Sequence, residues 1–127
     1  MRSHFLALSF ATALGLSSSA WAHHSAAMFD ATKTDTLVGT VTQYQFENPH
    51  AWIYMTVVNP SGVQKKFSIE MTSPNLLQRA GWRPATLKPG DRVTVKIHPL
   101  RDGSDGGSFV EITLPDGKVM SQQRAAG

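Results

Sequence analysis

The sequence predicts an all-β fold, a small five-stranded barrel with one short helix between strands three and four. Two observations lead to this fold class. From Thr36 onward apolar residues recur with period two, and Gly and Pro punctuate these runs, as expected of short strands joined by turns. The chain of 127 residues is 41% apolar and 17% charged, which suits one globular domain and is unlike a disordered chain.

The first expected strand changes phase near Thr42 and Gln43, because its apolar residues before and after this point have opposite parity. A β-bulge there would bend the strand. The other four strands keep a regular alternation. In chain order, the expected inward rows are Leu37, Gly39 and Val41; Ile53, Met55 and Val57; Phe67, Ile69 and Met71; Val93, Val95 and Ile97; and Val110, Ile112 and Leu114.

Residues 59–62 and 88–91 are expected to form turns, since each combines Pro with Gly. One helix interrupts the strands: Ser73 can cap it, Pro74 suits its first position, and Gly81 suits the position after its end. Its short apolar stripe is Leu76, Leu77 and Ala80. Five strands, a bent first strand and this helix describe an OB-like barrel; an unrelated β-sandwich is the alternative.

The first 22 residues read as a cleaved export signal. Arg2 gives a positive start, residues 5–16 are apolar and small, and Ala22 ends a small-x-small pattern that signal peptidase accepts. A retained membrane anchor is the alternative, but the apolar run is shorter than a span needs. We therefore expect a periplasmic protein without a membrane anchor. The expected organisation is a signal peptide at 1–22, an N-terminal arm at 23–35, the OB-like β-barrel at 36–118, and a flexible C-terminal tail at 119–127.

Cleavage after Ala22 would make His23 the first residue, followed at once by His24. A free α-amine and an imidazole of one residue can chelate a metal ion, and nitrogen sites bind Cu(II) more tightly than other divalent first-row metals. His50, in the expected loop between strands one and two, or His98 would add a third nitrogen. The candidate metal ligands are therefore His23, His24 and His50, with copper as the candidate cofactor; a merely disordered, polar terminus is the alternative.

The outward face of strand two offers a second candidate site. Exposed aromatic rings beside a lysine can stack on a base, a sugar or a peptide. Alternatively, Met28 and Phe29 of the arm cover these rings and form a small accessory core. The candidate ligand- or partner-binding residues are Trp52, Tyr54, Lys66 and Arg101.

Several function classes are disfavoured by the composition. The chain has no Cys, which excludes disulfides, thiolate metal sites and Cys nucleophiles. Processing would lower the net charge from +3 to +2 by removing Arg2, and we expect no nucleic-acid partner from so weak a charge. No catalytic motif stands out, so a binding module is favoured over an enzyme, with a copper-dependent oxidant as the least favoured hypothesis.

The chain resembles domain of unknown function 6152, whose members are small exported bacterial proteins. This resemblance supports export and brings no assigned activity or catalytic residue. The matching blocks are His23-His24-Ser25, Met28-Phe29-Asp30, Gly39-Thr40-Val41, Asn48-Pro49-His50, Ser73-Pro74, Gly81-Trp82, Leu87-Lys88-Pro89-Gly90-Asp91, Pro99-Leu100-Arg101-Asp102-Gly103-Ser104 and Leu114-Pro115-Asp116-Gly117-Lys118.

Overall fold

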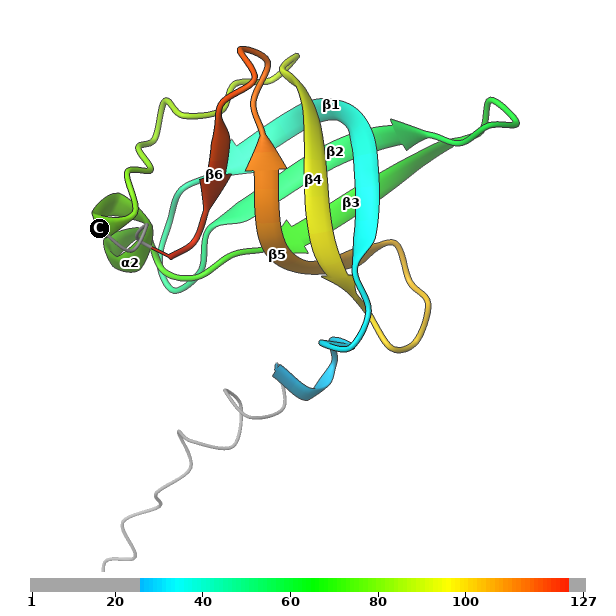
Figure 1. Cartoon of the computed structure of the whole chain (residues 1–127), viewed down its shortest axis with the longest axis horizontal. Helices are drawn as coiled ribbons and strands as arrows, with labels where there is room; N and C mark the ends of the chain where they lie inside the picture. Colours follow the sequence, from blue (N-terminus) through cyan, green and yellow to red (C-terminus); the bar gives the residue numbers. More distant parts are fainter. Residues whose placement is uncertain (1–25, 124–127) are drawn as a thin grey trace, which may run out of the picture.

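A computed structural model describes residues 26–123 and confirms the predicted fold class: strands form a closed barrel, and one short helix lies between the third and fourth strands (Figure 1). The strand order is β3-β2-β1-β4-β5-β6, and an additional pairing of β3 with β5 closes the barrel. The elements are β1 (Asp35–Gln45), β2 (Trp52–Val58), β3 (Gln64–Glu70), α2 (Pro74–Arg79), β4 (Arg92–Pro99), β5 (Gly106–Thr113) and β6 (Val119–Ser121).

Strand β1 is long and bent because it pairs with two different strands. Its first part pairs with β4, from Asp35 to Thr40, and its later part pairs with β2, from Gly39 to Gln45. The register with β2 shifts between Val41 and Gln43, so the predicted bulge is confirmed. In Figure 1 the strand runs up one side of the barrel and then crosses over it.

Strand β5 departs from the expected alternation. The structure buries Phe109 and Ile112, whereas Val110 is only partly buried. The register with β4 shifts between Lys96 and Ile97, and Val110 is the residue that has no partner there. A second bulge therefore corrects the predicted inward row of this strand, in which Val110 was expected to point into the core.

Two glycines allow the barrel to close. Gly106 and Gly107 of β5 lie opposite Ser68 and Ile69 of β3 in the short parallel pairing. Both glycines are buried. An added Cβ on Gly106 would lie 2.8 Å from the carbonyl oxygen of Ser68 in β3, and one on Gly107 would lie 2.5 Å from the carbonyl oxygen of His98 in β4. The backbones at this junction therefore approach too closely for a side chain.

The barrel interior is a single apolar core, in which Trp82 lies next to the rings of Tyr44 and Phe109. Trp82 is fully buried, its ring meets Phe109 edge-on at 5.5 Å, and its Nε1–H donates to the Ser121 carbonyl at 2.8 Å. Buried polar groups of this kind need a partner, and here the backbone of β6 supplies it. The core residues are Leu37, Val41, Ala51, Ile53, Met55, Ile69, Met71, Leu77, Trp82, Leu87, Val93, Val95, Ile97, Phe109, Ile112 and Met120.

Helix α2 begins at Pro74 as predicted, but two details differ. Ser73 occupies the N-cap position in an extended conformation without a side-chain capping hydrogen bond. Leu77 is fully buried, whereas Leu76 is 49% exposed, so only part of the expected apolar stripe faces the core. A helix of six residues is too short to bury a whole face, and Leu76 is left on its outer side.

The expected flexible tail from residue 119 needs correction, because β6 occupies Val119–Ser121 and buries Met120. The turn at residues 114–118 returns the chain to β5, with the Leu114 amide donating to the Lys118 carbonyl at 2.8 Å. Gln122, just after β6, also binds to β5, since its Nε2 donates to the Phe109 carbonyl at 3.0 Å. A strand of three residues shows too little alternation to be predicted from the sequence.

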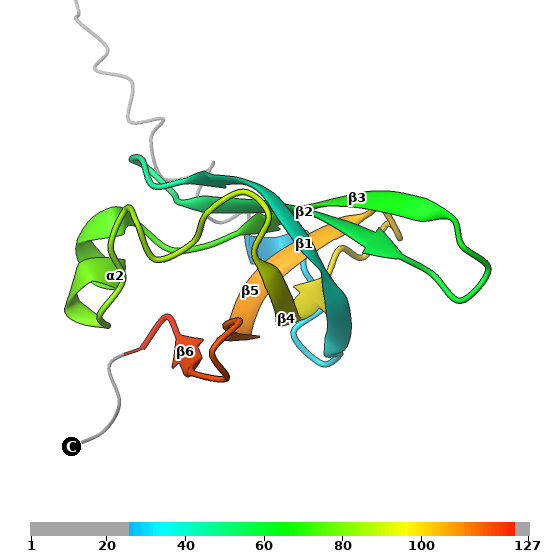
Figure 2. The same cartoon turned by 90° about the horizontal axis from the view of Figure 1, so that it is seen from above.

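The hairpin of β2 and β3 extends from the barrel on the side away from α2, as Figures 1 and 2 both show. Its tip at residues 59–62 is the predicted turn, with Gly62 at φ 84° and its amide donating to the Asn59 carbonyl at 2.9 Å. The second predicted turn is also present, since the Asp91 amide donates to the Lys88 carbonyl at 3.1 Å. Within residues 26–123, no helix has the length and apolar character that crossing a membrane requires.

Candidate functional site

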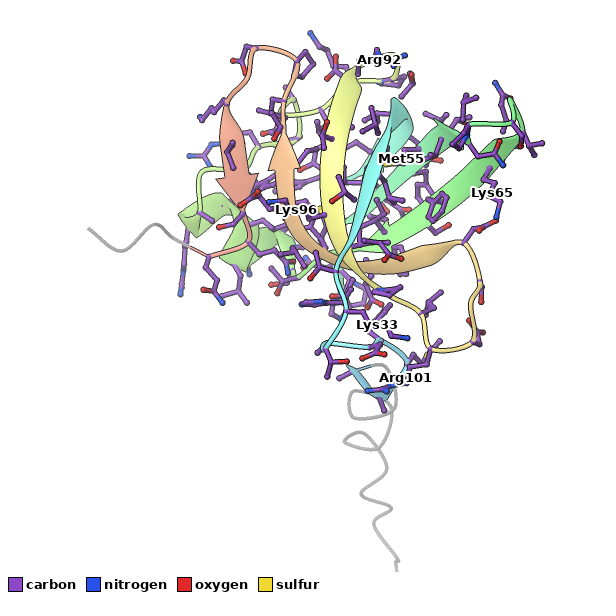
Figure 3. The ribbon with its side chains drawn as sticks, turned by 45° about the vertical axis from the view of Figure 1, so that its right-hand side comes forward. Lys33, Met55, Lys65, Arg92, Lys96 and Arg101 are labelled. Carbon is purple, nitrogen blue, oxygen red and sulfur yellow. The ribbon has the colours of Figure 1, made fainter. Side chains whose placement is uncertain are left out.

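The N-terminal arm is fastened to the loop that follows β4. The Asp30 amide donates to the Pro99 carbonyl at 2.8 Å, and the Arg101 amide donates to the Met28 carbonyl at 2.9 Å. The Arg101 Nε also donates to the Ala27 carbonyl at 3.0 Å. Figure 3 shows Lys33 and Arg101 together at this end of the molecule, with Arg92 at the opposite end. Arg101 therefore lies where it holds the arm.

A local turn stiffens the arm just before β1. The Asp30 carboxylate accepts hydrogen bonds from the Thr32 hydroxyl at 2.6 Å and from the Thr32 amide at 3.1 Å. These bonds, the hydroxyl one first, hold the pKa of Asp30 below its usual value. His98 adds a further link, since its Nδ1 lies 2.8 Å from the Lys33 carbonyl oxygen. The arm thus reaches the barrel in a defined position.

The beginning of the arm and His50 meet at one hollow of about 280 Å³. His50 comes from the loop between β1 and β2, and the other lining residues come from β3, from the segment after it, from β5 and from Gln122. The hollow is lined by Ala26, Phe29, His50, Glu70, Met71, Thr72, Ser108 and Gln122.

Hydrogen bonding fixes which nitrogen of His50 is free. Its Nδ1 lies 2.9 Å from the Met71 carbonyl oxygen. A carbonyl oxygen only accepts hydrogen bonds, so Nδ1 carries a proton and, in the neutral ring, Nε2 keeps its lone pair. The Glu70 Oε1 lies 3.7 Å from the same Nδ1 and favours the same arrangement. Metal-binding histidines are typically oriented in this way.

His23 and His24 lie outside the described residues, so their positions are not part of the structure. Their reach follows from covalent geometry: three Cα–Cα steps lead from Ala26 to His23, which allows at most about 11 Å. Within residues 26–123 no three His, Cys, Asp or Glu side chains form a group that could hold a metal ion. His50 with Glu70 would therefore need ligands from the chain before Ala26 to form a metal site.

The two aromatic residues of the second candidate site lie together on the outer face of β2. The rings of Trp52 and Tyr54 are nearly parallel, with an interplanar angle of 16° and centroids 6.2 Å apart. Both side chains are partly buried, and the Tyr54 hydroxyl donates to Gln45 Oε1 at 3.4 Å. Of the two arm residues expected as an alternative cover for these rings, Met28 is 54% exposed, and Phe29 forms a bridge with Leu100 and lines the His50 hollow.

Lys66 lies on the same outer face as these rings, exposed and opposite Thr56 in the pairing of β2 with β3. The structure thus brings Trp52, Tyr54 and Lys66 onto one surface, and places Arg101 at the arm instead. Trp52 also lies opposite Glu70, so the aromatic pair borders the His50 hollow.

The sequence did not reveal a second hollow, of about 480 Å³, on the outer side of the bend of β1. It continues the face of β2 beyond Tyr54, because Thr56 and Val58 belong to it. Its lining is mainly polar and uncharged, with Arg92 as the charged member. The residues are Val38, Gly39, Thr40, Thr42, Thr56, Val58, Gln64 and Arg92.

Glu70 and Arg92 are the site residues that sequence reasoning missed. Glu70 is outward on β3, but its neighbours His50 and Trp52 are identified only by the strand register. Arg92 begins β4 directly after a turn, where a solvated arginine is the ordinary expectation. No local motif distinguishes either residue.

Together the fold and these surfaces define a small OB-like barrel with a docked N-terminal arm. Residues 12–109 match the family described as "Family of unknown function (DUF6152)", so the chain belongs to this family and the predicted resemblance is confirmed. No curated protein matches the chain significantly.

Among solved structures, the chain is similar to a crystal structure of Rim1, a mitochondrial single-stranded DNA binding protein from S. cerevisiae. The identity is 14%, the TM-score is 0.47, and the match covers 65% of this chain and 93% of that chain. This neighbour is a DNA-binding protein, which corrects the expectation that nucleic acid is excluded as a partner. At this level of similarity it assigns no ligand to the present chain.

Proposed function

We propose that this chain is an exported, periplasmic binding module whose processed form begins at His23 and binds a transition-metal ion, preferably Cu(II). The observation that carries the proposal is that Ala26 and His50 line the same hollow. Since the arm is held by Arg101 at the Ala27 and Met28 carbonyls, the residues before Ala26 start from a fixed point near His50.

The proposed ligands are the His23 amine and imidazole, with His24 beside them, and Nε2 of His50. Three nitrogens suit Cu(II). The α-amine and imidazole have ordinary pKa values of about 7.7–8.0 and 6.5, so a metal displaces their protons near neutral pH. The Met71 carbonyl supports His50 in this role by keeping the Nδ1 proton in place.

The test is Cu(II) binding by isothermal titration of protein that starts at His23, with free glycine as a competing chelator. Loss of an oriented ligand costs at least as much as loss of its supporting contacts, which is about 10–100-fold in affinity. We therefore expect His50→Ala to weaken binding by about 100-fold. Lys118→Ala is the control, because this exposed side chain lies in the turn before β6 and does not line the hollow of His50.

A serine added before His23 is expected to weaken binding as well, since the amine would no longer belong to the histidine. The same serine added after Gly127 should leave binding unchanged. Equal affinity for both extended proteins would contradict the role of the terminal amine. Equal affinity of His50→Ala and the parent protein would contradict the role of His50.

A second candidate function is an interaction module that uses the outer face of β2 without a metal. The nearly parallel rings of Trp52 and Tyr54 favour it, because they lie on the outer surface beside an exposed lysine, Lys66. Exposed aromatic pairs of this kind are suited to holding a flat or apolar ligand surface.

A further inference from the structure

We propose that the outer face of β2, from Trp52 to Val58, binds an extended oligosaccharide that carries carboxylate groups. This inference rests on the second candidate function and is independent of the metal. It names the ligand class from three features of the face: a pair of rings, a row of uncharged hydrogen-bonding groups, and an arginine at the far end.

The rings of Trp52 and Tyr54 form one end of this face. They are nearly parallel and remain partly accessible. Aromatic rings pack well against the C–H face of a sugar ring, which is apolar on that side. The rigid strand holds the pair in place, because the inward residues Ile53 and Met55 on either side of Tyr54 are fully buried.

The hollow of about 480 Å³ forms the other end, and its chemistry suits hydroxyl groups. Thr40, Thr42, Thr56 and Gln64 supply hydroxyls and one amide, each of which can both donate and accept. A ligand made of sugar units presents the matching donors and acceptors at every unit. A peptide ligand would present few side-chain hydroxyls to such a lining.

Arg92 is the feature of this face that favours a ligand with an anionic group. Its side chain lines the hollow and makes none of the ion pairs found among residues 26–123. A guanidinium binds a carboxylate through two parallel hydrogen bonds, which also fixes orientation. Figure 3 shows Arg92 at the end of the barrel away from Arg101 and Lys33.

The charge pattern favours an acidic sugar over a single-stranded nucleic acid. A polyphosphate backbone is bound through many lysines and arginines along its track. Here the outer face of β2 and β3 offers Lys66 and also carries Glu70, and Arg92 of β4 borders it. Six residues separate Trp52 from Val58, which gives a track of about 20 Å, long enough for several sugar units.

The experiment is titration of the full chain with three probes of similar length: oligogalacturonate, an uncharged cello-oligosaccharide, and oligo-dT. Affinity is followed by calorimetry. We expect oligogalacturonate to bind, and Arg92→Gln to weaken it by about tenfold, as loss of one charge-assisted contact predicts. Arg79→Gln on α2 is the matched control and should leave the affinity unchanged. Trp52→Ala should weaken both sugars.

The outcomes separate this inference from the function on which it rests. If oligo-dT binds more tightly than oligogalacturonate and Trp52→Ala weakens the binding of oligo-dT, the face is a binding surface but the proposed ligand class is wrong. If the uncharged sugar binds as well as the acidic one, or if Arg92→Gln has no effect, the role of the carboxylate is wrong. If none of the three probes binds, both the inference and the interaction module are overturned.

Discussion

At the scale of single residues, hydrogen bonds to backbone carbonyls determine which ring nitrogen of His50 and of His98 carries the proton. The Nδ1 of His50 lies 2.9 Å from the Met71 carbonyl oxygen, and the Nδ1 of His98 lies 2.8 Å from the Lys33 carbonyl oxygen. Both rings therefore present Nε2 outward as an acceptor when neutral. They differ in their surroundings, since only His50 shares a hollow with the start of the described arm.

Trp82 gives a prediction about stability at this scale. Trp82→Phe removes the hydrogen bond to the Ser121 carbonyl and leaves a space in the core, so we expect the free energy of unfolding to fall by about 2 kcal/mol. Urea denaturation followed by circular dichroism measures the change. Trp52→Phe is the control, and because Trp52 is partly exposed its effect should stay below about 1 kcal/mol. A larger loss in Trp52→Phe than in Trp82→Phe would contradict the assignment of Trp82 to the core.

Local pattern was enough to single out some site residues and insufficient for others. His50 follows Asn48-Pro49 in an expected loop, and Trp52 alternates with buried Ile53, so both could be found from the sequence. Glu70 becomes a candidate site residue only because it lies opposite Trp52 and its Oε1 lies 3.7 Å from His50 Nδ1. Such contacts depend on strand register, which a single sequence does not specify between distant segments.

At the scale of elements, the departures from the predicted strand pattern occur at a strand that is bent or very short. The bulge in β1 could be predicted because apolar residues lie on both sides of it, whereas β5 has Val110 at the bulge itself. Because Val110 is apolar, the alternation in this part of the sequence looks regular and does not indicate the bulge. Strand β6 has three residues, too few to show a period.

The close pairing of β4 with β5 gives a prediction about the stability of the barrel. Gly107→Ala would place a methyl group 2.5 Å from the His98 carbonyl oxygen and 2.7 Å from Ile97 Cδ1, so the two strands would have to separate. We expect a loss of about 3 kcal/mol in the free energy of unfolding. Equilibrium unfolding in urea checks it.

Gly117→Ala is the control for this substitution. Gly117 has a φ of 87° and open space around its Cβ position, so alanine there costs only the conformational strain, about 1 kcal/mol. If Gly107→Ala were tolerated as well as Gly117→Ala, the close approach of β4 and β5 would not be required for the barrel.

At the scale of the whole molecule, the proposed metal site depends on processing. We expect the protein recovered from the periplasm to begin at His23, with 22 of its 127 residues removed. Intact-mass spectrometry of untagged protein measures this directly. Replacing Ala20 and Ala22 together by bulky residues should block cleavage and leave the longer form. A processed protein that begins at any other residue would remove the amine of His23 from the proposed site.

The docking of the arm onto Arg101 has a consequence for how the proposed site would assemble. Ala26 lies at the hollow, and three Cα–Cα steps lead from it to His23, so His23 can reach only positions within about 11 Å of Ala26. One molecule in that volume corresponds to an effective concentration on the order of 0.1 M or more, above the millimolar values typical of short flexible linkers. Arg101→Ala would remove the side-chain bond to the Ala27 carbonyl without touching a ligand, so metal affinity would report on this anchor as well as on the histidines.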